Sequence, residues 1–299
     1  MSISPRTYLG LSTLSLFAAG WALLPAQEDK SAQIQVHPVA GSVSMLEGEG
    51  GNIGVCAGPD GVLMIDDQFA GMAPKIQAAL ATLSKEPLRF VINTHCHGDH
   101  TGGNEIFGAL APIIAQTNVR VRMSKPSARQ GKEQPGSPAR ALPVITFDDR
   151  VLLHSNAEEI EVRHVNPAHT DGDSIVWFHT SNVVHMGDTF FNGRFPFVDL
   201  DSGGSVRGLT KDIADLLAEL PKDAHLIPGH GPLATIKDLE NYHAMLVDTQ
   251  KLVAQALAAG KDAALMKKEN LLAKYSSWSW DFINADTFLD LLIRDAKLK

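Results

Sequence analysis

One short segment of the chain concentrates side chains that bind metals. Residues 94–103 read Thr-His-Cys-His-Gly-Asp-His-Thr-Gly-Gly, so that His95, His97, Asp99 and His100 fall within six positions. Imidazole nitrogen and carboxylate oxygen are ligands that zinc prefers, and clustering them without a cation would cost repulsion and desolvation. An isolated histidine is more often structural, but this density predicts a zinc site.

Four ligands on one loop do not complete a dinuclear site, and three later motifs supply candidates for the remainder. His169 lies in a turn-rich stretch before an apolar run, Asp188 follows a short apolar run and a glycine, and His230 lies between two glycines. Small neighbours let the backbone approach a metal closely. The alternatives are a helix-capping role for Asp188 and a turn position for His230.

The ordered motifs HCHGDH, PAHTDGDS, MGD and PGHG resemble those of the metallo-β-lactamase superfamily, over essentially the whole chain after its N-terminal segment. The resemblance implies two zinc ions per chain, the first bound by His95, His97 and His169 and the second by Asp99, His100 and His230, with Asp188 bridging both. It also implies a hydrolase that opens an activated or strained carbonyl compound by means of a metal-bound hydroxide. Asp99 would orient the hydroxide and later pass on a proton.

The branches of this superfamily differ in substrate, and a β-lactam is our first expectation, with a lactone or thioester as the alternative. Lactamases with a cysteine ligand carry it where Asp188 stands, and a substrate-binding lysine three positions later, where this chain has Phe191. Asp188 and His100 make the chain more similar to the glyoxalase II, lactonase and quinoprotein-relay-like branches. The resemblance therefore favours a small-molecule acyl substrate without fixing which one.

Two residues near Asp188 are candidate substrate contacts. Arg194 could hold a substrate carboxylate, because a guanidinium binds carboxylates bidentately, although a plain surface arginine is the alternative. Phe191 belongs to an aromatic stretch with Phe190, Phe195 and Phe197 that could line an apolar pocket or pack the core.

Two other classes of function remain as hypotheses. The first is an iron-dependent oxidoreductase, because related sequences hold iron with a similar motif. The seven candidate ligands favour two metals over a single iron. The other is a non-catalytic protein in which the site is structural or captures metal. Metal analysis separates the first from a zinc hydrolase.

The N-terminus has the pattern of an export signal. Arg6 precedes an apolar run over residues 8–24, which Pro25 ends and a polar stretch follows. We therefore expect a signal peptide over residues 1–26, a hydrolase domain over residues 27–299, and a periplasmic or secreted protein with no integral membrane span after cleavage. An uncleaved anchor is the alternative.

Charge and length limit the remaining classes. The formal net charge of −8 argues against nucleic-acid binding, which needs a concentrated basic face, and 299 residues with 44% hydrophobic composition suffice for one large domain. The two cysteines, Cys56 and Cys96, permit a disulfide in an oxidising compartment without implying one, and Cys96 is expected to pack behind the ligands.

Short apolar runs punctuated by turn residues predict the elements that carry the motifs. Strands are expected near residues 62–65, 88–92, 113–115, 151–153, 160–165, 175–178 and 183–185. Helices are expected over 72–83, 206–220 and, after a capping box at Thr235 and Asp238, up to Gly260. Residues 125–140 should be irregular. The superfamily resemblance implies a mobile lid at the glycine-rich tip 47–51, and a simple turn is the alternative. Sheets with helices outside them indicate an α/β (α+β) fold, an αββα sandwich.

Overall fold

The structure is a computed structural model that describes residues 1, 33–129 and 132–298. The fold lies in the compact unit Ala32–Lys299. The expected signal peptide, residues 1–26, lies outside the described residues except for Met1. No helix among the described residues is long and apolar enough to cross a membrane.

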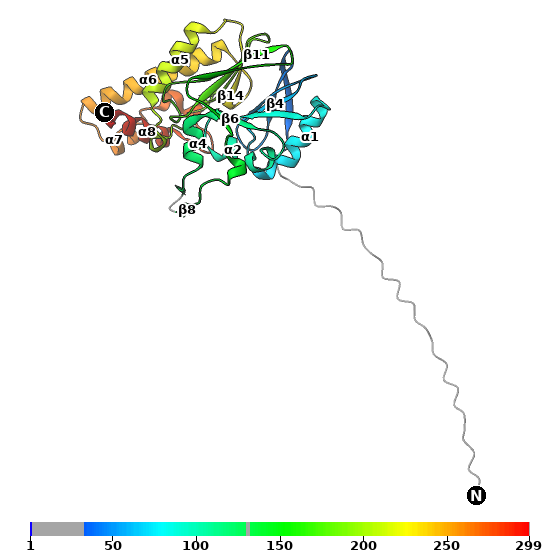
Figure 1. Cartoon of the computed structure of the whole chain (residues 1–299). Coiled ribbons are helices and arrows are strands. Elements are labelled where there is room, and N and C mark those ends of the chain that lie inside the picture. The colour runs from blue at the N-terminus through cyan, green and yellow to red at the C-terminus, as the bar shows by residue number, and fades with distance from the viewer. Residues whose placement is uncertain (2–32, 130–131, 299) are drawn as a thin grey trace. The chain divides into compact units, whose positions relative to one another are not determined.

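Two β-sheets form the centre of the fold (Figure 1). The first has seven strands, antiparallel from β1 to β4 and parallel from β4 to β9. In spatial order these strands are β1 (Gln35–Ala40), β2 (Val43–Glu47), β3 (Ile53–Gly58), β4 (Gly61–Ile65), β5 (Leu88–Ile92), β6 (Ile113–Gln116) and β9 (Ile145–Phe147).

The second sheet has six strands and is antiparallel except where β13 and β14 run parallel. Its strands are β10 (Arg150–Ser155), β11 (Glu158–His164), β12 (Ser174–Phe178), β13 (Val183–Phe191), β14 (His225–His230) and β15 (Ala234–Thr235). The parallel pair matters for the site, because it brings the ends of β13 and β14 to the same edge.

Helices cover the outer faces of both sheets. α1 (Ala73–Leu83) packs on the first sheet, while α5 (Val206–Glu219), α6 (Ile236–Ala258) and α8 (Ala285–Lys297) pack on the second. The shorter helices are α2 (Gly98–Thr101), α3 (Asn104–Phe107), α4 (Thr117–Met123) and α7 (Ala263–Lys268), with 3₁₀ turns at η1 (Ala70–Met72), η2 (Ala139–Ala141), η3 (Leu200–Ser202) and η4 (Ala273–Trp278). The predicted αββα sandwich is confirmed.

Three apolar layers hold the sandwich together. Between the sheets, Leu63, Ile92 and Ile114 of the first face Val176 and other residues of the second. A second layer lies under α1, and the largest lies under α5, α6 and α8. Removing this apolar surface from water is the main stabilising term, so the sheets provide a rigid base for the loops at their ends.

Most predicted elements agree with the structure, with two corrections. Residues 125–140 were expected to be irregular, but β7 (Ser127–Arg129) and β8 (Lys132–Gln134) form a short antiparallel pair. The strand expected over 183–185 continues to Phe191, because β14 pairs with it beyond a register shift at Gly187. The capping box is confirmed, since Thr235 and Asp238 bond to each other's backbone at the start of α6.

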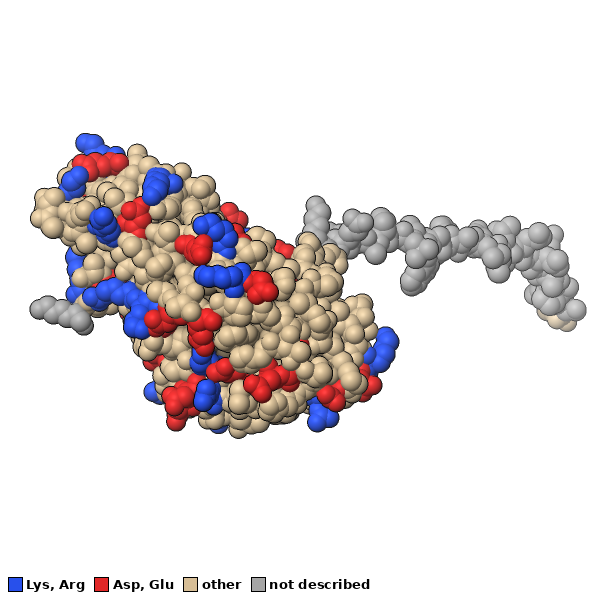
Figure 2. Space-filling view, turned by 90° about the horizontal axis from the view of Figure 1, so that it is seen from above, with Lys and Arg blue, Asp and Glu red and all other residues tan. Residues whose placement is uncertain are grey.

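The surface carries charges of both signs. In Figure 2, Lys and Arg side chains lie among Asp and Glu side chains on the face shown. Several are paired across short distances, as between Lys267 and Asp290 at 2.5 Å and between Arg163 and Glu219 at 2.8 Å. Exposed pairs of this kind contribute little to stability, about 0 to 1 kcal/mol each.

Candidate metal centre

The seven candidate ligands lie on loops and strand ends at one edge of the sandwich. His95 and His97 follow β5, and Asp99 and His100 belong to the short helix α2 directly after them. His169 lies between β11 and β12. The remaining two, Asp188 and His230, lie on the parallel neighbours β13 and β14. Parallel pairing brings Asp188 and His230 to one edge of the second sheet, and the packing of the two sheets brings the loop after β5, in the first sheet, to the same place.

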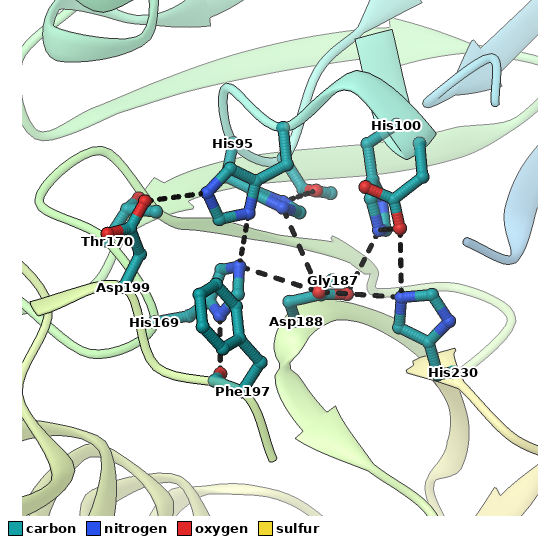
Figure 3. Close-up of polar contacts among 12 residues, drawn as sticks. His95, His100, His169, Thr170, Gly187, Asp188, Phe197, Asp199 and His230 are labelled. Carbon is teal, nitrogen blue, oxygen red and sulfur yellow. Dashed lines mark hydrogen bonds and ion pairs between the residues drawn. The ribbon is translucent and has the colours of Figure 1, made fainter. Parts of the chain in front are cut away.

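All seven side chains fall into groups whose ligand atoms lie within 4.8 Å of one another. The three groups are His95 with His97 and His169, His95 with His100 and Asp188, and Asp99 with His100 and His230. The first and third correspond to the two sets expected from the sequence. Figure 3 shows Asp188 between His169 and His230, with His95 and His100 beside them.

Asp188 links the two sets. Its Oδ2 lies 3.5 Å from Nε2 of both His169 and His230, and 3.9 Å from Nε2 of His95. Its Oδ1 lies 3.0 Å from Nε2 of His100. One buried carboxylate therefore faces four imidazoles, which is the position that a bridging ligand requires.

Contacts behind the ligands fix the orientation of their rings. Asp66 lies 2.7 Å from Nδ1 of His100 and accepts hydrogen bonds from the backbone and hydroxyl of Thr94, at 2.8 and 2.7 Å. The carbonyl of Phe197 is 2.7 Å from Nδ1 of His169. Partners of this kind set the tautomer that leaves the other nitrogen free for a metal.

Sequence analysis did not assign a role to Asp66 or to Asp199. Asp199 lies 3.0 Å from Nε2 of His97, although 102 positions separate the two residues. The only local sequence signal for Asp66 is its place at the end of the apolar run that forms β4, and in the structure it adopts a left-handed conformation with φ of 63°. Such a conformation is uncommon for a non-glycine residue and marks positions held by their surroundings.

Burial and charge set the protonation of the site in opposite directions. Burial lowers the pKa of His95 well below its usual range and that of His169 to about 4, so both imidazoles are neutral, the form that binds metals. Burial also opposes protonation of His100, but Asp188, Asp99 and Asp66 outweigh it and raise that pKa well above its usual value. The carboxylates therefore make this half of the site favourable for positive charge.

Burial would raise the pKa of Asp99, yet the neighbouring His100 and His230 lower it to about 2. For His230, burial is again outweighed, and Asp188 and Asp99 raise the pKa to about 9. Burial opposes ionisation of Asp188 as well, but His100, His230 and His169 outweigh it and hold its pKa well below the usual value. Asp99 and Asp188 are thus ionised at neutral pH, and they favour positive charge on the groups around them, whether protonated imidazole or a metal cation.

The donor set fits a pair of zinc ions. His95 Nε2, His100 Nε2 and Asp188 Oδ1 are buried and make no hydrogen bond among the described residues, although the last two face each other at 3.0 Å as an ion pair. Unsatisfied buried polar atoms are costly in a protein interior, and three in one place indicate that another group satisfies them. Nitrogen and oxygen donors at this density match the preference of zinc.

The glycine-rich tip after β2 is part of this arrangement. The amide of Gly51 donates to the carbonyl of Asp99 at 3.0 Å, and Gln68 donates to the carbonyl of Gly51 at 2.7 Å. A Cβ at Gly51 would lie 2.0 Å from the His100 ring. The tip expected as a lid or a simple turn therefore packs directly against a candidate ligand.

The two candidate substrate contacts differ in exposure. Phe191 is 1% exposed and its ring stacks on His230, with centroids 5.3 Å apart, so it supports a ligand from behind and presents no surface to a substrate. Phe190 and Phe195 are also buried. Arg194 is half-buried and lies over the ring of Trp280, 5.1 Å from its centroid.

The two cysteines are free. Cys56 is buried between the sheets, and Cys96 packs against a small apolar cluster that includes Val119 and Met123, in line with its expected packing role. Burial raises the pKa of the Cys96 thiol to about 12, so it is neutral at physiological pH.

The sequence profile of the Metallo-beta-lactamase superfamily matches residues 46–230, more than half of the chain. The chain belongs to the metallo-β-lactamase superfamily. The matched segment includes all seven candidate ligands and ends at His230, so α6, α7 and α8 lie beyond it.

Curated relatives are similar over part of their length. A hydroxyacylglutathione hydrolase from Polaromonas sp. (strain JS666 / ATCC BAA-500) is 33% identical over 142 residues, 47% of each chain, and one from Nitrosococcus oceani is 30% identical over 186 residues, 60% of each chain. A 2,4-dinitroanisole O-demethylase subunit alpha from Nocardioides sp. (strain JS1661) is 27% identical over 139 residues, 46% of this chain and 40% of that one. The chain spans about half the length of the curated relatives it matches.

Solved structures share the fold. A metallo-beta-lactamase from Pontibacter korlensis superposes with a TM-score of 0.58 at 16% identity, over 72% of this chain and 99% of that one. The DIM-1 metallo-beta-lactamase gives a TM-score of 0.59 at 15% identity, over 72% and 98%. At these identities the likeness concerns the fold alone.

Proposed function

We propose that this protein is a dizinc hydrolase of small activated acyl compounds, with a thioester as the first substrate to test. The observation that carries the proposal is the convergence of seven imidazole and carboxylate side chains into two sets joined by Asp188, with buried ligand atoms that make no hydrogen bond. The hydroxyacylglutathione hydrolases among the relatives support the thioester over the β-lactam that we expected first. A β-lactam and a lactone remain the next candidates.

The proposed assignment divides the ligands by position. His95, His97 and His169 would hold one zinc ion and Asp99, His100 and His230 the other, with Asp188 shared. Bound zinc supplies Lewis acidity and lowers the pKa of coordinated water toward neutrality.

Residues of the chain itself would position the reacting groups and transfer the protons. Asp188, whose side chain is 5% exposed, fixes the two ligand sets relative to each other because it faces histidines of both. The Asp99 side chain is 30% exposed and its Oδ2 lies 3.3 Å from Nε2 of His230. As the more accessible carboxylate, Asp99 is suited to orient the nucleophilic water and to carry a proton to the leaving group.

The test is metal analysis of the purified protein followed by a hydrolysis panel. The panel contains a hydroxyacyl-glutathione thioester, an acyl-homoserine lactone, nitrocefin and a carbapenem. We expect two zinc ions per chain and the fastest turnover with the thioester; a single iron per chain would support the oxidoreductase alternative.

A matched pair of variants tests the role of Asp99. Asp99→Asn should reduce kcat by about 10²- to 10⁴-fold, the usual contribution of a positioned acid or base. Asp149→Asn, an exposed aspartate in the turn before β10, is the control and should keep full activity. Equal activity of the two variants would instead favour a structural metal site.

We also propose that the protein is exported to the periplasm or secreted, on the basis of the sequence pattern over residues 1–26. Expression of the full chain followed by cell fractionation and N-terminal sequencing tests this. A cytoplasmic protein that retains its first residues would reject it.

A further inference from the structure

Aromatic rings border the ligand cluster on both of its halves. The ring centroid of Phe197 lies 6.0 Å from that of His97 and 5.8 Å from that of His169. The ring centroid of Trp280 lies 5.5 Å from that of His230. One ring therefore adjoins each of the two proposed metal sets.

A third ring joins these two. The centroid of Phe282 lies 5.6 Å from both Phe197 and Trp280, which completes a continuous row that we call the aromatic shelf (Phe197, Phe282 and Trp280). Phe282 is 60% exposed, the most exposed phenylalanine among the described residues. A large apolar side chain left in water beside a reaction centre is a recognition feature more often than a packing one.

Hydrogen bonds hold the shelf in place. The indole nitrogen of Trp280 donates to the carbonyl of Phe195 at 2.9 Å, and its backbone amide donates to the carbonyl of Ile283 at 3.0 Å. The ring also lies 6.2 Å from that of the buried Phe191. Because Trp280 is fixed before any ligand arrives, binding to it costs little conformational entropy.

Arg194 adds a positive charge to the shelf. Its guanidinium carbon lies 5.1 Å from the centroid of Trp280, in the geometry of a cation–π contact. No carboxylate among residues 33–129 and 132–298 pairs with this guanidinium. Its donors remain available to an anionic group that lies against the indole ring.

We propose that the shelf and Arg194 select the substrate: an acyl compound that carries an aromatic or comparably bulky apolar group and a negative charge. The apolar group stacks on Phe282 and Trp280, and the anionic group contacts Arg194. Arg194 and Phe197 lie within the segment that matches the superfamily, and Trp280 and Phe282 lie beyond it, so the C-terminal region contributes two of the four side chains.

The meaning of this inference rests on the proposed hydrolase function, but its test measures binding without turnover. The probes are phenylmethanesulfonate, methanesulfonate and benzyl alcohol, titrated calorimetrically into the zinc-loaded full-length protein. Sulfonates are weak zinc ligands, so binding to the metal should contribute little. Phenylmethanesulfonate and methanesulfonate differ mainly in the aromatic ring, and phenylmethanesulfonate and benzyl alcohol differ mainly in the charge.

We expect phenylmethanesulfonate to bind about tenfold more tightly than methanesulfonate, as one aromatic contact pair predicts. Phe282→Ala should remove most of that preference, and it should fold normally because the side chain is largely exposed. Arg194→Gln should weaken the binding of phenylmethanesulfonate about fivefold and leave the binding of benzyl alcohol unchanged. Leu265→Ala, an exposed apolar residue on α7, and Arg150→Gln are the controls.

Equal binding of phenylmethanesulfonate and methanesulfonate by the wild type, or wild-type binding by both Phe282→Ala and Arg194→Gln, would overturn the inference. Either result leaves the hydrolase proposal standing. A protein that binds phenylmethanesulfonate as expected, yet hydrolyses nothing in the substrate panel, would reject the hydrolase proposal and keep the binding site.

Discussion

Replacing Gly51 by alanine tests whether the tip after β2 maintains the second ligand set. An added Cβ would lie 2.0 Å from Cε1, 2.3 Å from Nε2 and 2.7 Å from Nδ1 of His100. The ring has no room to yield, since it is fully buried and Asp66 lies 2.7 Å from its Nδ1. The tip is equally constrained by the hydrogen bond from Gly51 to Asp99.

The size of the effect follows from these distances. Carbon atoms in contact lie about 3.5 to 4.0 Å apart, so the ring and the new Cβ must separate by about 1.5 Å. Nε2 is the atom that faces both Asp99 and Asp188, and the movement therefore displaces a proposed metal ligand. A displacement of about 1 Å in such a site can cost about 100-fold in rate. Overpacking should also reduce the free energy of unfolding by about 1 to 3 kcal/mol.

Zinc content, hydrolysis rate and thermal unfolding are the measurements. We expect Gly51→Ala to retain about one zinc per chain, because the three atoms nearest the new Cβ all belong to His100, a ligand of the second set, and to lose about 100-fold in kcat/KM. Gly71→Ala is the control, because a Cβ there would meet nothing within 4 Å. If Gly51→Ala binds two zinc ions and turns over substrate as the wild type does, the tip does not constrain the site as we argue.

Three further predictions follow from the structure. Asp66→Asn should lower zinc affinity by about 10- to 100-fold in a competition titration with a chelator, since Asp66 orients His100 and Thr94; unchanged affinity would exclude this orienting role. Burial raises the pKa of Asp212 to about 6, so the folded state loses stability as this carboxyl ionises between about pH 4 and pH 6. Asp212→Asn should therefore increase the free energy of unfolding by about 2 kcal/mol at pH 7 but not at pH 4. Its control is Asp149→Asn, an exposed aspartate before β10, and an equal gain at both pH values would contradict the assignment. Removing zinc with a chelator should lower Tm, because a ligand that binds only the folded state stabilises it; identical melting curves with and without the chelator would argue against metal in the folded protein.

Much of the candidate site could be predicted from local sequence patterns. The spacing of His95, His97, Asp99 and His100 is informative by itself, because few sequences place metal-binding groups so densely without a metal. The strand before them was predicted with the bounds that β5 has, since a short apolar run ended by polar residues is a strong local signal. The start of α6 was found for the same reason, through its capping box at Thr235.

Other features depend on pairings that no local pattern reveals. Asp66 and His100 lie 34 positions apart and meet only because β4 and β5 are parallel neighbours. The extension of β13 to Phe191 depends on β14 lying beside it. Hydrogen bonds between distant strands override local turn signals such as the glycine at 187, which is why the strand was predicted too short.

The sequence by itself determined which side chains could bind metal and the order of strands and helices, because ligand chemistry and hydrophobic periodicity are properties of residues and their near neighbours. Only the tertiary structure decided that Asp188 faces both histidine sets, that Gly51 packs on His100, and that Trp280 and Phe282 border the site. These contacts join segments separated by long stretches of chain. Their distances are set by how two sheets and their covering helices pack to bury apolar surface, a collective outcome that no single segment encodes.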